Sequence, residues 1–140
     1  MADIILTAKA KAVGGREGHV KSDTGVIDLP LKMPKNGETV SDATNPEQLF
    51  AAGYAACFDG ALNLMASKAK KEIESEIEAE VSLVKDEIDS GFKLAVTLHA
   101  TLQGVSNDEA TELVHKAHEF CPYSKATRDN VEVTLKVYTK

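Results

Sequence analysis

The residues of this sequence with the clearest chemical potential are its two cysteines, Cys57 and Cys121. Cys57 lies inside a long apolar run, and Cys121 comes directly before Pro122 at the expected end of a helix. A thiol reacts as its thiolate, and an apolar setting opposes ionisation of the thiol. Cys57 is therefore either an inert core residue or a reactive thiol that receives positive charge from elsewhere in the fold.

Arg16, in a glycine-flanked turn, is the candidate source of that charge. A guanidinium held beside Cys57 would lower the pKa of the thiol and would offer fork-shaped donors to a peroxide oxygen. Glu47 is a suitable carboxylate partner to fix Arg16. However, Thr44 and Glu47 also have the spacing of a helix capping box, which would occupy part of the same carboxylate.

The expected helix places a constraint on this site. Glu47 and Cys57 are about ten residues apart, which corresponds to roughly 15 Å along a straight helix. Three arrangements could reconcile the two positions: the helix breaks near Gly53, Arg16 spans the gap, or the site combines two chains. Small residues along the helix would allow a second backbone to approach closely, which makes the last arrangement a reasonable hypothesis.

Two other chemistries are less well supported. His115, His118 and Cys121 form an H-x-x-H-x-x-C pattern, but the third position drifts around the helix and there is no second cluster of strong ligands. We therefore predict no metal site. No serine lies in a G-x-S-x-G motif, so hydrolase chemistry of that kind has no support.

Length and composition favour one soluble domain over residues 1–140. The net charge of −6 argues against binding to a phosphate backbone. The N-terminus lacks the pattern of a signal peptide, and no apolar run reaches the roughly 18 residues that a membrane span requires. We expect a cytoplasmic protein, in which a disulfide is usually transient and catalytic.

The periodicity of apolar residues predicts an α+β fold in which a sheet wraps against a long central helix. Capping signals open both expected helices: Thr44 or Asn45 at the first, and a capping box of Ser106 and Glu109 at the second. Pro122 ends the second helix. The expected elements are strands over 3–13, 19–21 and 26–33, a helix from 44–47 to about 68, a hairpin of strands over 76–86 and 91–102, a helix over 106–120, and a strand over 129–137.

Three segments, residues 14–18, 44–58 and 121–128, closely resemble the organic hydroperoxide resistance (Ohr) family of the OsmC superfamily. The resemblance runs from the first strand to the last, although residues 70–90 carry no family motif. It implies an intertwined α+β homodimer with sites at the subunit interface. It also implies that Cys57 is the peroxidatic cysteine, Cys121 the resolving cysteine, Arg16 the activating arginine and Glu47 its carboxylate partner.

The activity implied by this resemblance is the reduction of organic hydroperoxides to alcohols. Cys57 would become a sulfenic acid and then form a disulfide with Cys121, which the lipoyl dithiol of a lipoylated protein would reduce. No bound cofactor is needed in this scheme.

Four aromatic side chains are candidates to line a pocket for an alkyl, aryl or fatty-acid tail, which would favour such hydroperoxides over hydrogen peroxide. They are Phe50, Phe58, Phe120 and Tyr123. Two alternatives stay open at this point. One is an OsmC-type relative with a different peroxide preference, and the other is a non-enzymatic module that binds a ligand or senses redox state.

Overall fold

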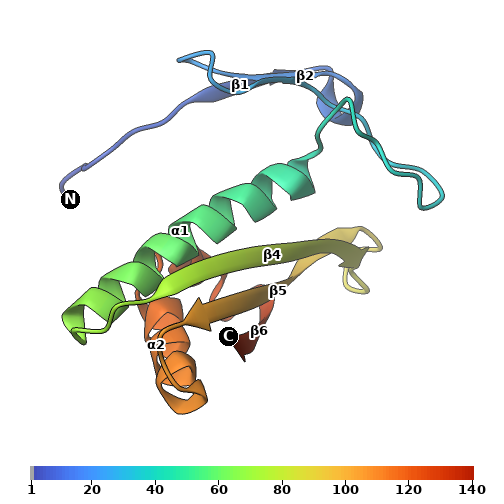
Figure 1. Cartoon of the computed structure of the whole chain (residues 1–140). Helices are drawn as coiled ribbons and strands as arrows, with labels where there is room; N and C mark the ends of the chain where they lie inside the picture. The colour runs from blue at the N-terminus through green and yellow to red at the C-terminus, as the bar shows by residue number, and fades with distance from the viewer. Residues whose placement is uncertain (1) are drawn as a thin grey trace. The chain divides into compact units, whose positions relative to one another are not determined.

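The computed structural model describes residues 2–140, which form two compact units, one up to Leu49 and one from Phe50 onward. The boundary between the units falls inside the long helix α1 (Figure 1). The elements in chain order are β1 (Ala10–Val13), the 3-10 helix η1 (Gly15–Glu17), β2 (His19–Ser22), β3 (Asp28–Pro30), α1 (Pro46–Lys68), β4 (Glu74–Lys85), β5 (Phe92–Gln103), α2 (Asn107–Phe120), α3 (Pro122–Thr127) and β6 (Glu132–Thr139).

The first unit is a three-stranded antiparallel sheet in the order β1-β2-β3. The turn between β1 and β2 carries Arg16, and glycines close it. Gly14 adopts a φ of 83°, which other residues rarely adopt. A side chain at Gly18 would place its Cβ 1.7 Å from the carbonyl oxygen of Val13, so this position also requires glycine. Only Leu31 and Thr44 are buried in this part of the described chain.

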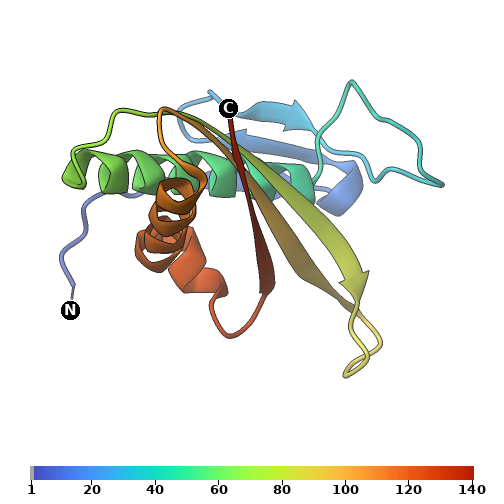
Figure 2. The same cartoon turned by 60° about the horizontal axis from the view of Figure 1, so that its bottom comes forward.

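The second unit is built on a sheet with the order β4-β5-β6. β4 and β5 form an antiparallel hairpin, whereas β6 runs parallel to β5. Alternate residues of β5 point into the core together with residues of α1 and α2, so both helices cover the same face of the sheet (Figures 1 and 2). The inward residues of β5 are Val96, Leu98, Ala100 and Leu102.

Most of the predicted elements are confirmed, but the strand expected over 26–33 is reduced to the three residues of β3, and two further differences concern the first strand and the helices. The expected strand over 3–13 is wrong in its first part, because β1 begins only at Ala10. Pro122 ends α2 as predicted but also begins α3, a short helix that was not predicted from the sequence. Proline is favoured in the first turn of a helix, so one residue performs both roles.

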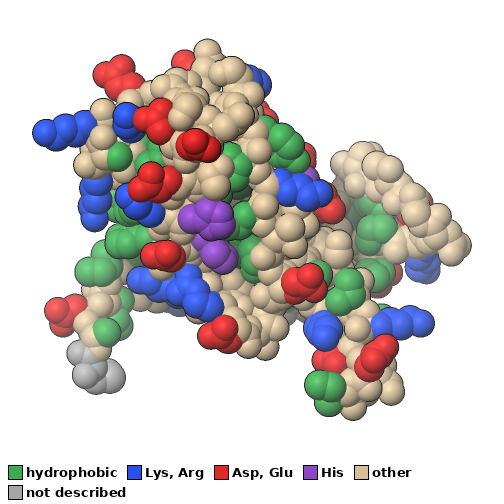
Figure 3. Space-filling model, turned by 90° about the horizontal axis from the view of Figure 1, so that it is seen from below, with side chains coloured by type: hydrophobic (Ala, Val, Ile, Leu, Met, Phe, Trp, Pro, Cys, Tyr) green, Lys and Arg blue, Asp and Glu red, His purple; other side chains and the backbone are tan. Residues whose placement is uncertain are grey.

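Helix α1 corrects one sequence-based exclusion. By length and composition alone it could span a membrane, since an 18-residue window in it has a mean hydropathy of 1.3. A core helix of a soluble protein meets the same criterion, and Tyr54, Phe58 and Leu62 of α1 are fully buried in the core of the second unit. The face shown in Figure 3 intersperses acidic and basic side chains, as is usual for a solvated surface.

Candidate functional site

The two thiols lie next to each other in the second unit. The Cys121 thiol donates toward the sulfur of Cys57, and the two Sγ atoms are 3.6 Å apart. Both cysteines are free, and they differ in access to solvent: Cys57 is half-buried, whereas Cys121 is completely buried. The fold thus brings together two residues that no local sequence motif connects.

Helix geometry places both cysteines. Cys57 lies on α1 between the buried residues Tyr54 and Phe58, so its side chain is held at the edge of the core. Cys121 joins α2 to α3, and its extended backbone (φ −60°, ψ 127°) ends one helix and begins the next. The sulfur of Cys121 is therefore fixed at a corner between two helices.

The environment within the second unit does not favour a thiolate at position 57. Burial raises the pKa of the Cys57 thiol above its ordinary value, and the adjacent Cys121 thiol acts in the same direction. The backbone N–H of Tyr123 opposes these effects and lowers the pKa. Because the net effect is upward, a reactive Cys57 requires a further stabilising group.

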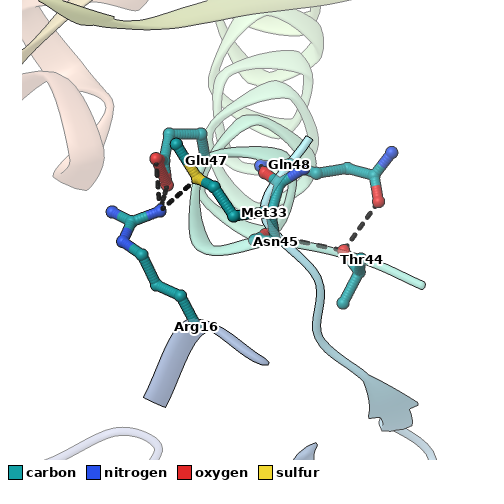
Figure 4. A network of polar contacts seen from close by, with 6 residues as sticks. All are labelled: Arg16, Met33, Thr44, Asn45, Glu47 and Gln48. Atoms are coloured by element: carbon teal, nitrogen blue, oxygen red, sulfur yellow. Dashed lines mark hydrogen bonds and ion pairs between the residues drawn. The ribbon is translucent and has the colours of Figure 1, made fainter. Parts of the chain in front are cut away.

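Arg16 and Glu47 form an ion pair in the first unit (Figure 4). The Nη1 atom of Arg16 lies 2.7 Å from one carboxylate oxygen of Glu47 and 3.1 Å from the other. A longer contact of 3.8 Å joins the same nitrogen to the sulfur of Met33. Among the described residues a single nitrogen of Arg16 makes all these contacts, which leaves the other guanidinium N–H groups for another acceptor.

The start of α1 explains why Glu47 is free to bind Arg16. The expected capping box of Thr44 and Glu47 is wrong: Asn45 caps the helix instead, since its Oδ1 accepts the backbone N–H of Gln48 at 2.8 Å. The Thr44 hydroxyl donates to the side-chain oxygen of Gln48 at 2.6 Å (Figure 4). The carboxylate of Glu47 therefore has no capping role that would compete with Arg16.

Helix α1 continues through Gly53 without interruption from Pro46 to Lys68. The arrangement in which the helix breaks near Gly53 is therefore wrong. Arg16 and Glu47 belong to the first unit and the two cysteines to the second. A contact between Arg16 and Cys57, within one chain or between two, stays a prediction.

The four aromatic residues proposed for a pocket lie in different surroundings. Phe50 and Tyr123 meet edge to face, with ring centroids 6.4 Å apart, and both are partly accessible. Phe58 is completely buried in the core. Phe120 is 43% exposed, and the ammonium groups of Lys68 and Lys125 lie over its ring. Phe50 and Tyr123 are thus the pair that combines apolar surface with access.

The described residues contain no group of three or more His, Cys, Asp or Glu side chains placed to hold a metal ion. His118 makes a different contact, since its Nδ1 lies 2.8 Å from the hydroxyl of Ser124. Burial lowers the pKa of His118, and the positive charge of Arg128 acts in the same direction. Its neutral form is therefore favoured, as a hydrogen-bonded histidine at the edge of a core.

A buried polar cluster between α1 and α3 was not predicted from the sequence. The hydroxyl of Tyr54 lies 2.8 Å from that of Ser124 and 3.2 Å from that of Thr127. A signal for it was present: Tyr54 is the only tyrosine in the apolar run of α1, and a buried tyrosine hydroxyl needs a hydrogen-bond partner. The partner could not be identified because Ser124 and Thr127 lie far along the chain.

Comparisons with known proteins cover nearly the whole sequence. Residues 37–136 match the family of OsmC-like proteins. The chain is 56% identical over 133 residues to the organic hydroperoxide resistance protein OhrB of Bacillus subtilis, covering 95% of this chain and 98% of the relative. It is 53% identical over 139 residues to OhrA of the same organism, covering 98% and 99%. The crystal structure of OhrB of Bacillus subtilis matches with a TM-score of 0.89 at 55% identity and covers 96% of this chain and 99% of that one.

Proposed function

Because the chain belongs to the organic hydroperoxide resistance family of OsmC-like proteins, we propose that it is a thiol peroxidase that reduces organic hydroperoxides to alcohols. The observation that carries this proposal is the pair of free thiols 3.6 Å apart. One of them is partly accessible and the other is fully buried. That asymmetry matches the separate tasks of meeting a peroxide and of resolving the oxidised product.

In the first step the Cys57 thiolate attacks the terminal oxygen of the hydroperoxide. The S–O bond forms as the O–O bond breaks, and the alkoxide leaves and takes up a proton to become the alcohol. Cys57 is oxidised by two electrons to a sulfenic acid. In the second step the Cys121 sulfur attacks the Cys57 sulfur, the S–O bond breaks, and water leaves as the disulfide forms.

Arg16 has the proposed role of stabilising the thiolate of Cys57, with Glu47 orienting the guanidinium. The ion pair supports this role, because Glu47 contacts only one nitrogen of Arg16 and leaves donors for the sulfur or for a peroxide oxygen. The upward effect of burial on the pKa of Cys57 supports it as well, since a compensating positive charge is needed for the chemistry.

The proposed substrates carry an alkyl, aryl or fatty-acid tail. Phe50 and Tyr123 offer partly accessible apolar surface, and a tail buried there would gain about 25 cal/mol per Å². Hydrogen peroxide has no tail and gains nothing from this surface. We therefore expect higher catalytic efficiency on organic hydroperoxides than on hydrogen peroxide.

We also propose a homodimer in which each site takes residues from both chains. Two exposed apolar surfaces support it. The first unit leaves Ile4, Ile5 and Leu6 more than four-fifths exposed. The face of α1 away from the core presents small residues and one leucine to solvent, namely Ala52, Ala56, Gly60 and Leu64. A dimer would double the 15.0 kDa mass of the chain in solution.

The reductant in this proposal is the dithiol of a lipoyl group on another protein, and the compartment is the cytoplasm. A dithiol that reduces the Cys57–Cys121 disulfide by exchange must first reach one sulfur. Cys57 is the more accessible of the two, so the exchange begins there. No bound cofactor takes part, because the two sulfurs carry the electrons.

The experiment compares three forms of the protein with cumene hydroperoxide and a lipoyl reducing system. The wild type should turn over, and Cys57→Ser should not. Cys121→Ser should still reduce one equivalent of peroxide but should fail to recycle through the lipoyl system. Normal turnover by Cys57→Ser would contradict the proposed function. Oxidation of the wild type without turnover would instead favour a redox-sensing module.

A further inference from the structure

We propose that Ser124, held between Tyr54 and His118, is a positioning residue that sets the buried Cys121 sulfur for its attack on oxidised Cys57. This inference rests on the proposed thiol peroxidase function and deepens it. It assigns a role in the second chemical step to residues that take no part in the first.

The hydroxyl of Ser124 is the centre of a polar cluster that is buried except for the half-buried ring of His118 at its edge. It lies 2.8 Å from the hydroxyl of Tyr54 and 2.8 Å from Nδ1 of His118. Thr127 completes the cluster, with its hydroxyl 3.1 Å from the carbonyl oxygen of Ser124. Tyr54 and Ser124 are completely buried, and Thr127 is 3% exposed. Hydrogen bonds in such a dry setting are costly to lose, because the remaining partner stays unsatisfied.

The cluster connects the helices that carry the two thiols. Tyr54 lies three residues before Cys57 on α1, so the two side chains share one side of that helix. Ser124 lies three residues after Cys121, within the first turn of α3. The 2.8 Å hydrogen bond between Tyr54 and Ser124 is therefore a cross-link close to the 3.6 Å approach of the two sulfurs.

His118 connects a third helix, α2, to the cluster. It lies in the last turn of α2, and its ring accepts the Ser124 hydroxyl when Nδ1 is unprotonated. The Tyr54 hydroxyl then donates to Ser124, so every hydroxyl has a partner. The lowered pKa of His118, caused first by burial and then by Arg128, favours the neutral ring that this arrangement requires.

This geometry separates the two steps of the reaction. Oxidation of Cys57 depends on access for the peroxide and on the thiolate, neither of which involves the Ser124 hydroxyl. Disulfide formation depends on where Cys121 is held, and Cys121 sits at a corner whose orientation the cluster fixes. A misplacement of about 1 Å can slow a positioned reaction by about 10²-fold. Loss of the cluster should thus slow the second step selectively.

The test uses Tyr54→Phe, which removes the hydroxyl and keeps the ring that contacts Phe50 and Tyr123. Tyr138→Phe is the matched control, because it removes a hydroxyl whose partner is His99 on the sheet, at 3.0 Å. Stopped-flow measurement with cumene hydroperoxide gives the rate of Cys57 oxidation. Trapping with dimedone, followed by mass spectrometry, gives the rate at which the sulfenic acid disappears into the disulfide.

We expect Tyr54→Phe to oxidise Cys57 within about twofold of the wild-type rate and to form the disulfide at least about tenfold more slowly. The trapped sulfenic acid should accumulate in this variant and not in Tyr138→Phe. Equal slowing of both steps would mean that the cluster only stabilises the fold, and it would overturn the inference. An unchanged rate of disulfide formation would overturn it as well.

Ser124→Ala is a second variant with the same readout, and it tests the positioning role if Tyr54→Phe does not fold. The double variant should slow disulfide formation by about as much as the stronger single variant, because both substitutions break the same Tyr54–Ser124 hydrogen bond. Failure of the wild type to oxidise Cys57 at all would contradict the proposed function itself. If the wild type forms the disulfide and the variants form it equally fast, only the positioning role is overturned.

Discussion

Oxidation should stabilise the fold strongly, because the Cys57–Cys121 disulfide closes a long loop. The two sulfurs lie 3.6 Å apart across a sequence separation of 64 residues. The loss of chain entropy in the unfolded state for a loop of that length corresponds to about 4 kcal/mol at 25 °C. Because the sulfurs already lie next to each other, we expect little opposing strain. The midpoint of thermal unfolding should rise by roughly 10–15 °C.

Equilibrium unfolding in urea measures this gain directly. The reduced protein and the protein treated with one equivalent of cumene hydroperoxide are compared at the same concentration, with the disulfide confirmed by mass spectrometry. Cys121→Ser is the control and should show no gain on oxidation. An intrachain disulfide with an unchanged unfolding free energy would contradict the loop-closure reasoning. Disulfides formed only between chains would contradict the arrangement of the two thiols.

Two further predictions concern a helix glycine and a surface carboxylate. A Cβ on Gly53 would lie 2.8 Å from the Tyr123 hydroxyl, so Gly53→Ala should lack the gain in stability of about 1 kcal/mol that alanine gives over glycine in a helix. In a Tyr123→Ala background, urea unfolding should show that gain. Equal effects of Gly53→Ala in both backgrounds would exclude the contact. The hydrogen bond from Lys71 lowers the pKa of Glu109 from 4.5 to about 2, so the contribution of this carboxylate to stability should be complete above pH 4.5 and be lost as pH falls toward about 2. An NMR titration of the Glu109 carboxyl should show a higher pKa in Lys71→Met, and an unchanged value would refute the role of Lys71.

The sequence predicted elements whose signals are local. The β4–β5 hairpin follows from alternating apolar residues on both sides of a turn. The capping box of Ser106 and Glu109, which opens α2, is confirmed in both of its hydrogen bonds. In contrast, residues 3–8 lie outside any strand although Ile4, Ile5 and Leu6 favour one, so propensity alone gave the wrong result there.

Individual contacts of the candidate site were predictable where a residue type implies its chemistry, whereas the approach of Arg16 to Cys57 stays a prediction. The cysteines and the Arg16–Glu47 pair were identified, because a thiol is a nucleophile once ionised and a guanidinium binds a carboxylate with matched geometry. From the residue types alone, the 3.6 Å approach of the thiols was not predictable, and only the family resemblance implied that the two would pair. The Tyr54–Ser124 hydrogen bond was not predicted at all. These two contacts join residues that are 64 and 70 positions apart, and only the packing of α1 against α2 and α3 brings these residues together.

The proposed mechanism depends most on the ionisation of Cys57, which the absorbance of the thiolate near 240 nm reports. In Cys121→Ser, which leaves one thiol, we predict a Cys57 pKa below neutrality. Arg16→Gln should raise this pKa by about 1–3 units, the usual effect of an adjacent opposite charge. A Cys57 thiol that is protonated at neutral pH and insensitive to Arg16→Gln would contradict the central claim.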